Sequence, residues 1–157
     1  MGSRTRDETI ETVFITGGAG FLGINLIRHL LARQMKVVSF DIADFGYPER
    51  TQVSAVAGDI RRFDALVAAM RGATVVVHCA AALPSYSTRE IMSTEVEGTR
   101  NVLKAAAQIG IERVVHISST AIYGRRTSGT TEDSETEILG PYAEAKVLAE
   151  RECLEYG

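Results

Sequence analysis

The chain has 157 residues, of which 45% are hydrophobic, and this is enough for one domain with a substantial core. Its formal charge of −3, with mixed signs along the sequence, offers no basic surface for nucleic acid and no charged patch for a membrane. The two cysteines, Cys79 and Cys153, lie far apart, so we expect no disulfide framework, no metal site and a cytoplasmic protein. No segment is apolar over the length of a membrane span, and the polar residues 1–11 are expected to form a flexible leader.

Short β-branched segments then alternate with longer amphipathic ones. Strands are predicted over residues 12–16, 36–41, 53–58, 73–81 and 112–118. Their near-continuous apolar character is typical of strands that are buried on both faces of a parallel sheet. Helical spacing of apolar residues predicts helices over 20–34, 61–72, 87–110 and 142–157, and a long loop over 125–140. With right-handed crossovers, this order predicts an α/β Rossmann fold: a doubly wound parallel sheet of strand order 3-2-1-4-5 between helices.

A glycine-rich segment, "TGGAGFLG" at residues 16–23, lies between the first strand and the first helix. Its glycines have the spacing G-x-x-G-x-x-G, and each meets a different physical demand. Gly17 permits the tight turn, Gly20 lets the backbone approach a pyrophosphate, and Gly23 lets the helix pack closely on the strand. Unpaired N–H groups at the helix start would face the anion. A helix-entry turn whose glycines serve packing alone is the alternative.

Two acidic residues follow the second and third predicted strands. Asp41 can accept hydrogen bonds from both hydroxyls of an adenosine ribose and would repel a 2′-phosphate, so NAD is favoured over NADP. A solvated acid at the end of a strand is the alternative. Asp59 could accept a hydrogen bond from the adenine amino group, or it could be an ordinary N-cap of the next helix.

A second group of residues follows the fifth predicted strand. Tyr142 and Lys146, in "PYAEAK", share one face of a helix. A phenol is a poor base at neutral pH unless a neighbouring cation stabilises its anion, which Lys146 could do. A hydroxyl of "SST" (118–120) could hold the reacting oxygen of a substrate, although these residues also serve ordinary turns. His78 and His116 lie within strands and are interpreted as core residues.

Taken together in this order, "TGGAGFLG", Asp41, "GDI", "HCAA", "EGTRNVLKAA", "SSTAIYG" and "PYAEAK" resemble the extended short-chain dehydrogenase/reductase family, the NAD-dependent epimerase/dehydratases. The resemblance runs from about Val13 to the end of the chain. It implies the following NAD-binding residues: Gly17, Gly20, Phe21, Leu22, Gly23, Asp41, Asp59, Ile60, Ala80, Ala81, Tyr142 and Lys146. It also implies that Tyr142 is the catalytic acid/base, that Lys146 holds the nicotinamide ribose and supports the tyrosine, and that Ser119, with Thr120 as alternative, is the catalytic hydroxyl.

The sequence departs from the family at two points. Where the family often reads "NVxGT", this chain reads "EVEGT", so Glu95 replaces the usual asparagine. Family members are also about twice as long, and their later half supplies most of the substrate pocket and a further strand. We therefore expect residues 12–157 to be an NAD-binding domain, the amino-terminal part of an enzyme, whose substrate domain is absent from this chain.

The resemblance implies hydride transfer between NAD and a carbinol carbon. A nucleotide-sugar epimerase or dehydratase is the first expectation, and a hydroxysteroid- or dihydroflavonol-type dehydrogenase/reductase is the second. A dinucleotide-binding module without turnover is the alternative from another class. Helices 87–110 and 142–157 resemble the pair through which this family often forms a homodimer, although packing on the sheet would equally explain their apolar faces.

Overall fold

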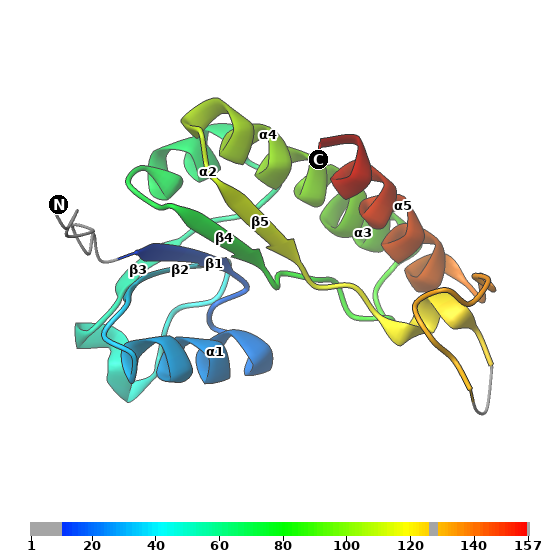
Figure 1. Ribbon diagram of the computed structural model, residues 1–157, viewed down its shortest axis with the longest axis horizontal. Helices are drawn as coiled ribbons and strands as arrows, with labels where there is room; N and C mark the ends of the chain where they lie inside the picture. The colour runs from blue at the N-terminus through cyan, green and yellow to red at the C-terminus, as the bar shows by residue number, and fades with distance from the viewer. Residues whose placement is uncertain (1–10, 126–128, 157) are drawn as a thin grey trace, which may run out of the picture.

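A single parallel sheet organises the computed structural model, which describes residues 11–125 and 129–156. Its strands are β1 (Thr12–Thr16), β2 (Lys36–Asp41), β3 (Ser54–Ala57), β4 (Val75–His78) and β5 (Arg113–His116). They are arranged in the order β3-β2-β1-β4-β5, which confirms the predicted doubly wound fold (Figure 1). Residues 1–10 of the predicted leader lie outside the described residues. Glu11 is already tied to the sheet, because its carbonyl accepts a hydrogen bond from the Lys36 amide at 3.2 Å.

The helices follow the predicted alternation. They are α1 (Phe21–Leu31), α2 (Phe63–Met70), α3 (Thr88–Met92), α4 (Thr99–Ile109) and α5 (Pro141–Tyr156), with short 3-10 turns η1 (Pro48–Thr51) and η3 (Thr120–Tyr123). The predicted helix over 87–110 has an unpredicted π-helical segment, η2 (Ser93–Gly98), between α3 and α4. π-Helical segments are rare overall, and those that occur often lie at functional sites.

The hydrophobic core lies in two layers, one on each face of the sheet. Helix α1 covers one face, where Val13 and Ile15 of β1 pack with Ile24 and Ile27. Helices α2 and α4 cover the other face, where Phe14 packs with residues of both helices (Figure 1). Strand β1 is therefore buried on both faces, which explains the continuous apolar run in its sequence.

Three strands, β3, β4 and β5, are shorter than predicted. The largest difference is at β4, which ends at His78, whereas the prediction ran to residue 81. Ala80 instead turns toward the end of β1, and its amide donates to Thr16 Oγ1 at 3.2 Å. Residues 79–81 are apolar because they line the site described below, which hydropathy alone cannot separate from a buried strand.

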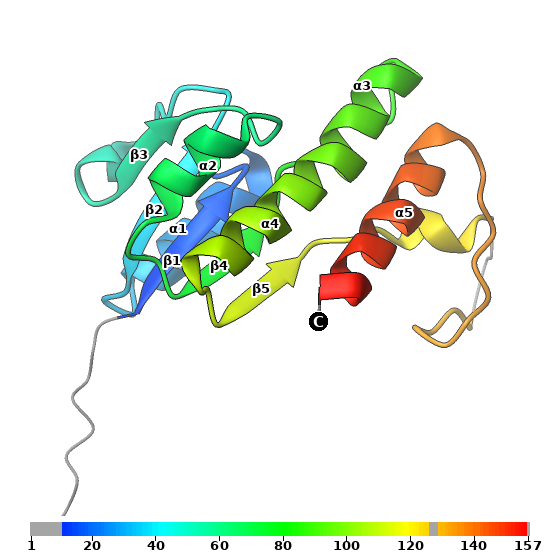
Figure 2. The same cartoon turned by 90° about the horizontal axis from the view of Figure 1, so that it is seen from above.

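Helix α5 packs against α3, η2 and α4, beyond the β5 edge of the sheet (Figure 2). An ion pair between α4 and α5 fixes their contact, because Arg100 Nε donates to Glu152 Oε2 at 3.0 Å. Within the described residues, β5 has a strand neighbour on one side only. The helices of residues 11–125 and 129–156 include none with the length and apolar character needed to cross a membrane.

Candidate functional site

The glycine-rich loop joins β1 to α1 at the carboxyl edge of the sheet. Gly17 has φ +69°, and its amide donates to Phe40 O at 2.9 Å. A Cβ atom at Gly17 would lie 2.6 Å from Ala80 N, so a side chain fits neither the backbone conformation nor the space. A Cβ atom at Gly23 would lie 2.7 Å from Gly18 Cα, so α1 packs directly on the loop. The two glycines thus keep the loop flat against the end of β4.

The amino terminus of α1 opens toward a cavity. Gly20 is the N-cap residue, no side chain caps the helix, and no acidic residue lies in its first turn. The first amide groups of a helix have no intrahelical partner and attract an anion. The cavity measures about 340 Å³, and its lining includes Gly17, Gly20, Asp41, Asp59, Ile60, Ala80 and Ala81. The structure thus brings together most of the predicted cofactor residues, while Phe21 and Leu22 are exposed on the first turn of α1.

Asp41 ends β2 beside this loop. Its Oδ2 accepts a hydrogen bond from the Ala19 amide and its Oδ1 accepts one from the Ala43 amide, both at 2.9 Å. Each carboxylate oxygen has further acceptor capacity toward the cavity. Asp41 therefore fixes the glycine-rich loop in addition to any contact with a ligand, a role that its position in the sequence did not predict.

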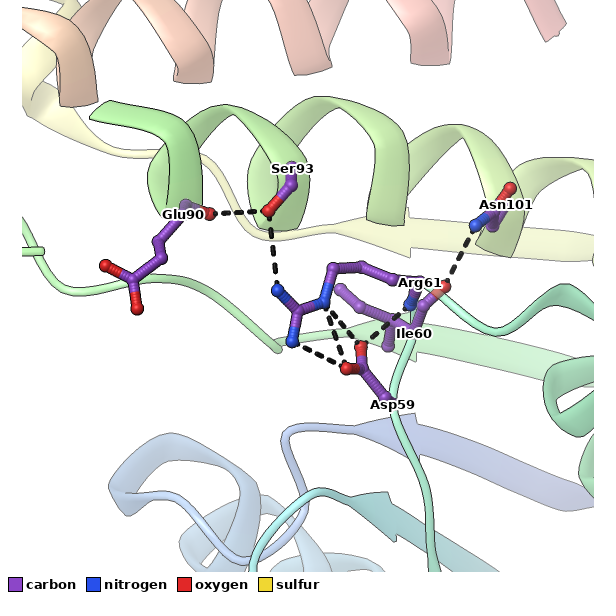
Figure 3. Close-up of polar contacts among 6 residues, drawn as sticks. All are labelled: Asp59, Ile60, Arg61, Glu90, Ser93 and Asn101. Carbon is purple, nitrogen blue, oxygen red and sulfur yellow. Dashed lines mark hydrogen bonds and ion pairs between the residues drawn. The ribbon is translucent and has the colours of Figure 1, made fainter. Parts of the chain in front are cut away.

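Asp59 lines the same cavity and is held by Arg61. Figure 3 shows the contacts between the two side chains. The Arg61 guanidinium contacts both carboxylate oxygens, with Nη2 2.6 Å from Oδ2, and the Arg61 amide donates to Oδ1 at 2.9 Å. These hydrogen bonds lower the pKa of Asp59, and the largest cause is the hydrogen bond from the Arg61 side chain. The N-cap alternative for Asp59 was wrong, because the N-cap of α2 is Arg62 and no side chain caps that helix.

Arg61 and Ile60 connect this loop to the rod, the continuous helical segment formed by α3, η2 and α4. Arg61 Nη1 donates to Ser93 Oγ of η2 at 3.4 Å, and Asn101 Nδ2 donates to Ile60 O at 3.3 Å (Figure 3). The Ile60 side chain is buried over Gly98, where a Cβ atom would collide with it. The wall of the cavity is thus fastened to η2 by contacts that are remote in sequence.

The second predicted group lies after β5 and on α5. Ser119 Oγ accepts a hydrogen bond from the Ala121 amide at 3.2 Å and so caps η3, which packs against α5. Ser118 Oγ is buried and has no hydrogen-bond partner among residues 11–125 and 129–156, and Thr120 is exposed. The turn-capping role considered for one of these hydroxyls thus belongs to Ser119, which still has its own O–H to donate.

Tyr142 and Lys146 share one face of α5, with Lys146 Nζ 5.8 Å from the centre of the Tyr142 ring. Lys146 is buried, 2% exposed, and its Nζ donates to Ile117 O at 3.1 Å just after β5. The same ammonium lies 2.9 Å from Oε2 of Glu95, which is buried in η2. The family motif drew attention to Glu95, but nothing in the sequence predicted this ion pair.

Two histidines, the buried His78 and the partly buried His116, lie on the strands behind the lysine. His78 bonds to Thr16 Oγ1 at 2.6 Å and to Thr99 Oγ1 at 3.0 Å, and its ring centre is 5.3 Å from that of His116. Burial, followed by the charges of His116 and Lys146, lowers the pKa of His78 to about 3. Burial and the Lys146 charge lower the pKa of His116 to about 4. Both rings are therefore neutral at pH 7.

The thiols nearby are also neutral. Burial raises the pKa of Cys79 to about 11 and also raises that of Cys153. Both cysteines are free. Within the described parts of the chain, no group of three or more His, Cys, Asp or Glu side chains is arranged to hold a metal ion.

Comparison with known proteins defines the class. The model of the NAD dependent epimerase/dehydratase family matches residues 13–157. The chain belongs to this family.

The curated relatives include enzymes with different substrates. A "3 beta-hydroxysteroid dehydrogenase/Delta 5→4-isomerase" from Mycobacterium tuberculosis is 34% identical over 96% of this chain and 44% of its own length. A "Putative dihydroflavonol 4-reductase" from Synechocystis is 35% identical over 92% of this chain and 44% of its own length. The chain thus spans less than half the length of these relatives.

Solved structures with the same fold contain NAD. One is UDP-glucose 4-epimerase from Thermus thermophilus in complex with NAD, which has a TM-score of 0.83 and is 32% identical to this chain. The match covers 93% of this chain and 50% of the epimerase chain. The dTDP-glucose 4,6-dehydratase DesIV from Streptomyces venezuelae, with NAD bound, has a TM-score of 0.83 and 30% identity over 92% of this chain and 51% of its own.

Proposed function

We propose that this chain is the NAD-binding part of an enzyme that oxidises or reduces a carbinol carbon. The observation that carries the proposal is the uncapped start of α1, which opens with Gly17 and Asp41 onto one cavity. The residues present fit a dinucleotide. The pyrophosphate would contact the amides of the glycine-rich loop, and the adenosine ribose would contact Asp41. Ile60, Ala80 and Ala81 would supply the apolar walls, and Phe21 and Leu22 would flank the pyrophosphate.

Asp59 has a more limited role in this proposal than its position in the sequence suggested. Because Arg61 engages both of its carboxylate oxygens, an adenine amino group would share an oxygen already bonded to the guanidinium. The pair of Asp59 and Arg61 therefore forms one edge of the adenine pocket. Its link to Ser93 keeps that edge at a fixed distance from η2.

Bound NAD would accept or donate the hydride, and the chain's own residues would position the substrate and move the proton. Tyr142 would take the proton from the substrate hydroxyl, or return it, at its phenolic oxygen. The ammonium of Lys146 would stabilise the tyrosinate and donate to the nicotinamide ribose. Ser119 would donate its hydroxyl hydrogen to the reacting oxygen of the substrate, while the Ala121 amide holds the Ser119 oxygen in place.

For the substrate, we propose a nucleotide sugar, with epimerisation or dehydration as the reaction. The support is the likeness to solved epimerase and dehydratase structures over nine-tenths of this chain. The second candidate is a hydroxysteroid or dihydroflavonol, because curated relatives of similar identity have those names. The two candidates differ in net redox change: an epimerase or dehydratase regenerates its NAD, whereas a dehydrogenase converts NAD to NADH and a reductase converts NADH to NAD.

The experiment titrates the chain with NAD and adds UDP-glucose, dTDP-glucose or a 3-beta-hydroxysteroid, or supplies NADH with a dihydroflavonol, and follows NADH absorbance and product chromatography. Tyr142→Phe is expected to lower turnover by about 100- to 10,000-fold and to change NAD affinity far less, because the phenolic proton is lost while the ring remains. Tyr156→Phe, at the exposed end of the same helix, is the matched control.

The outcomes separate an enzyme from a binding module. Turnover that needs Tyr142 supports the enzyme. Tight NAD binding without turnover of any substrate would instead support a dinucleotide-binding module in this length of chain. A folded chain that does not bind NAD would contradict both.

We also propose a homodimer in the cytoplasm. The support for the dimer is the side-by-side packing of the α3–η2–α4 rod with α5 and the exposure of Leu154, 82% exposed, at the end of α5. Sedimentation of Leu154→Glu against the unmodified chain tests it, with a shift to monomer expected. The support for the cytoplasm is the pair of free cysteines.

A further inference from the structure

Glu95 is a buried carboxylate in the middle of the π-helical segment η2. It is 1% exposed, and its two oxygens have different partners. Oε1 accepts a hydrogen bond from the Ala82 amide at 2.7 Å, and Oε2 lies 2.9 Å from Lys146 Nζ. Oε2 has no other hydrogen-bond partner in residues 11–125 and 129–156. The ion pair with Lys146 is therefore the contact that offsets the free-energy cost of burying this charged oxygen.

The contacts of Glu95 connect three parts of the site. Ala82 directly follows Ala80 and Ala81, which line the cavity, and Lys146 also bonds to Ile117 O after β5. One carboxylate therefore sets the position of the ammonium relative to the ends of both strands. The π-helical backbone presents Glu95 toward α5 at this point of the rod.

The two histidines and two cysteines around Lys146 carry no charge at pH 7. His78 and His116 on the strands have pKa values of about 3 and about 4. Burial raises the pKa values of Cys79 and of Cys153, so both thiols stay protonated. In the described chain, the buried charges of this cluster are thus one ammonium and one carboxylate, and their sum is zero.

We infer that Glu95 is a positioning residue which neutralises Lys146 and so sets the charge of the nicotinamide subsite. The inference rests on the proposed function, because Lys146 is placed at the nicotinamide ribose there. The oxidised nicotinamide ring is a cation and the reduced ring is neutral. A subsite of zero net charge accepts the oxidised ring without the repulsion that an unpaired ammonium would exert. Glu95 thus favours the oxidised form of the bound cofactor.

The test is the ratio of the dissociation constants of NAD⁺ and NADH, measured by calorimetry on the unmodified chain and on Glu95→Gln. Glutamine keeps the length of the side chain and the acceptor for the Ala82 amide, and removes only the charge. We expect the ratio to shift against NAD⁺ by about tenfold, because at an effective dielectric constant of about 20 a unit charge roughly 10 Å away changes the binding of a cation by about this factor. Glu97→Gln, exposed two residues away, is the matched control and should change the ratio less than about twofold.

A second readout needs no cofactor. Urea unfolding of Glu95→Gln, Lys146→Met and the double variant forms a double-mutant cycle. The double variant is expected to lose less stability than the sum of the two single losses, because each single change leaves one buried charge or polar group without its partner. If the stability losses of the two single variants simply add in the double variant, the inferred coupling between Glu95 and Lys146 is wrong.

The outcomes separate this inference from the proposed function. An unchanged NAD⁺/NADH ratio in Glu95→Gln, with both nucleotides bound, would overturn the charge role and leave the proposed function standing. A folded, unmodified chain that binds neither nucleotide would overturn the proposed function and the charge role together. In that case the unfolding cycle still decides whether Glu95 is the counter-ion of Lys146.

Discussion

The glycine-rich loop and the Tyr142–Lys146 face of α5, which the proposed function places on two sides of one site, are held in opposite ways. The loop is fixed by backbone packing: Gly17 lies flat on the end of β4, and Asp41 holds the Ala19 amide. The lysine is fixed by buried charge, through Glu95 and the Ile117 carbonyl. We therefore expect the first side to be sensitive to an added atom and the second side to a lost charge. The predictions below use this difference.

The largest effect is expected at Gly17. Gly17→Ala should lower the free energy of unfolding by more than about 3 kcal/mol, because the new Cβ meets the Ala80 backbone in addition to the cost of a positive φ. Gly110→Ala is the matched control, since Gly110 has φ +81° with no atom near its missing Cβ. It should lose only about 1–2 kcal/mol. Equal losses in urea unfolding would show that backbone conformation alone, and not close packing, selects glycine at position 17.

The next largest effect is the pH dependence of the free energy of unfolding, which His78 near the buried Lys146 should dominate. The pKa of His78 is about 3 in the folded chain and about 6.5 when unfolded, so the unfolded chain binds more protons between these values. Stability is therefore fully present above about pH 6.5 and falls as pH falls toward 3. His78 alone should account for about 2 kcal/mol between pH 6.5 and pH 5. Urea unfolding at several pH values checks this, and His78→Asn should have a flatter pH dependence. An equal slope would contradict the buried neutral ring.

The smallest effect is expected at Asp41. Asp41→Asn should reduce the preference for NAD over NADP by about tenfold, because the charge that repels a 2′-phosphate is lost while an acceptor for the Ala19 amide remains. Asp44→Asn removes the same charge from an exposed position three residues later and is the control. Calorimetric titration of both variants with both nucleotides measures the change. Unchanged discrimination in Asp41→Asn would remove Asp41 from the proposed role.

The two sides also differ in how far the sequence predicted them. The spacing of Gly17, Gly20 and Gly23 between a strand and a helix predicted the loop, because all its geometry is local. The sheet order followed from the alternation of elements and the hand of the crossovers. Strand ends were less accurate, since the apolar residues 79–81 line the site after the last ladder position of β4.

The contacts of Glu95 and Asp59 could not be predicted in the same way. The Glu95–Lys146 pair depends on how α5 lies against η2, 51 residues away in sequence, and no local pattern encodes that packing. The π-helical backbone of η2 was equally hidden, because no pattern in its six residues, STEVEG, separates a π-helix from an α-helix. Arg61 was overlooked because "GDI" drew attention to the acid alone, although a basic residue two positions later is the signal for a local ion pair.

The most direct test of the account is a titration of the folded chain with NAD followed by the backbone amide resonances. The account predicts the largest shifts at Gly18–Leu22, with further shifts at Ala80 and Ala81 and little change along β5. No shifts in a folded chain, or shifts centred on the edge of β5, would contradict the assignment of the glycine-rich loop as the cofactor site.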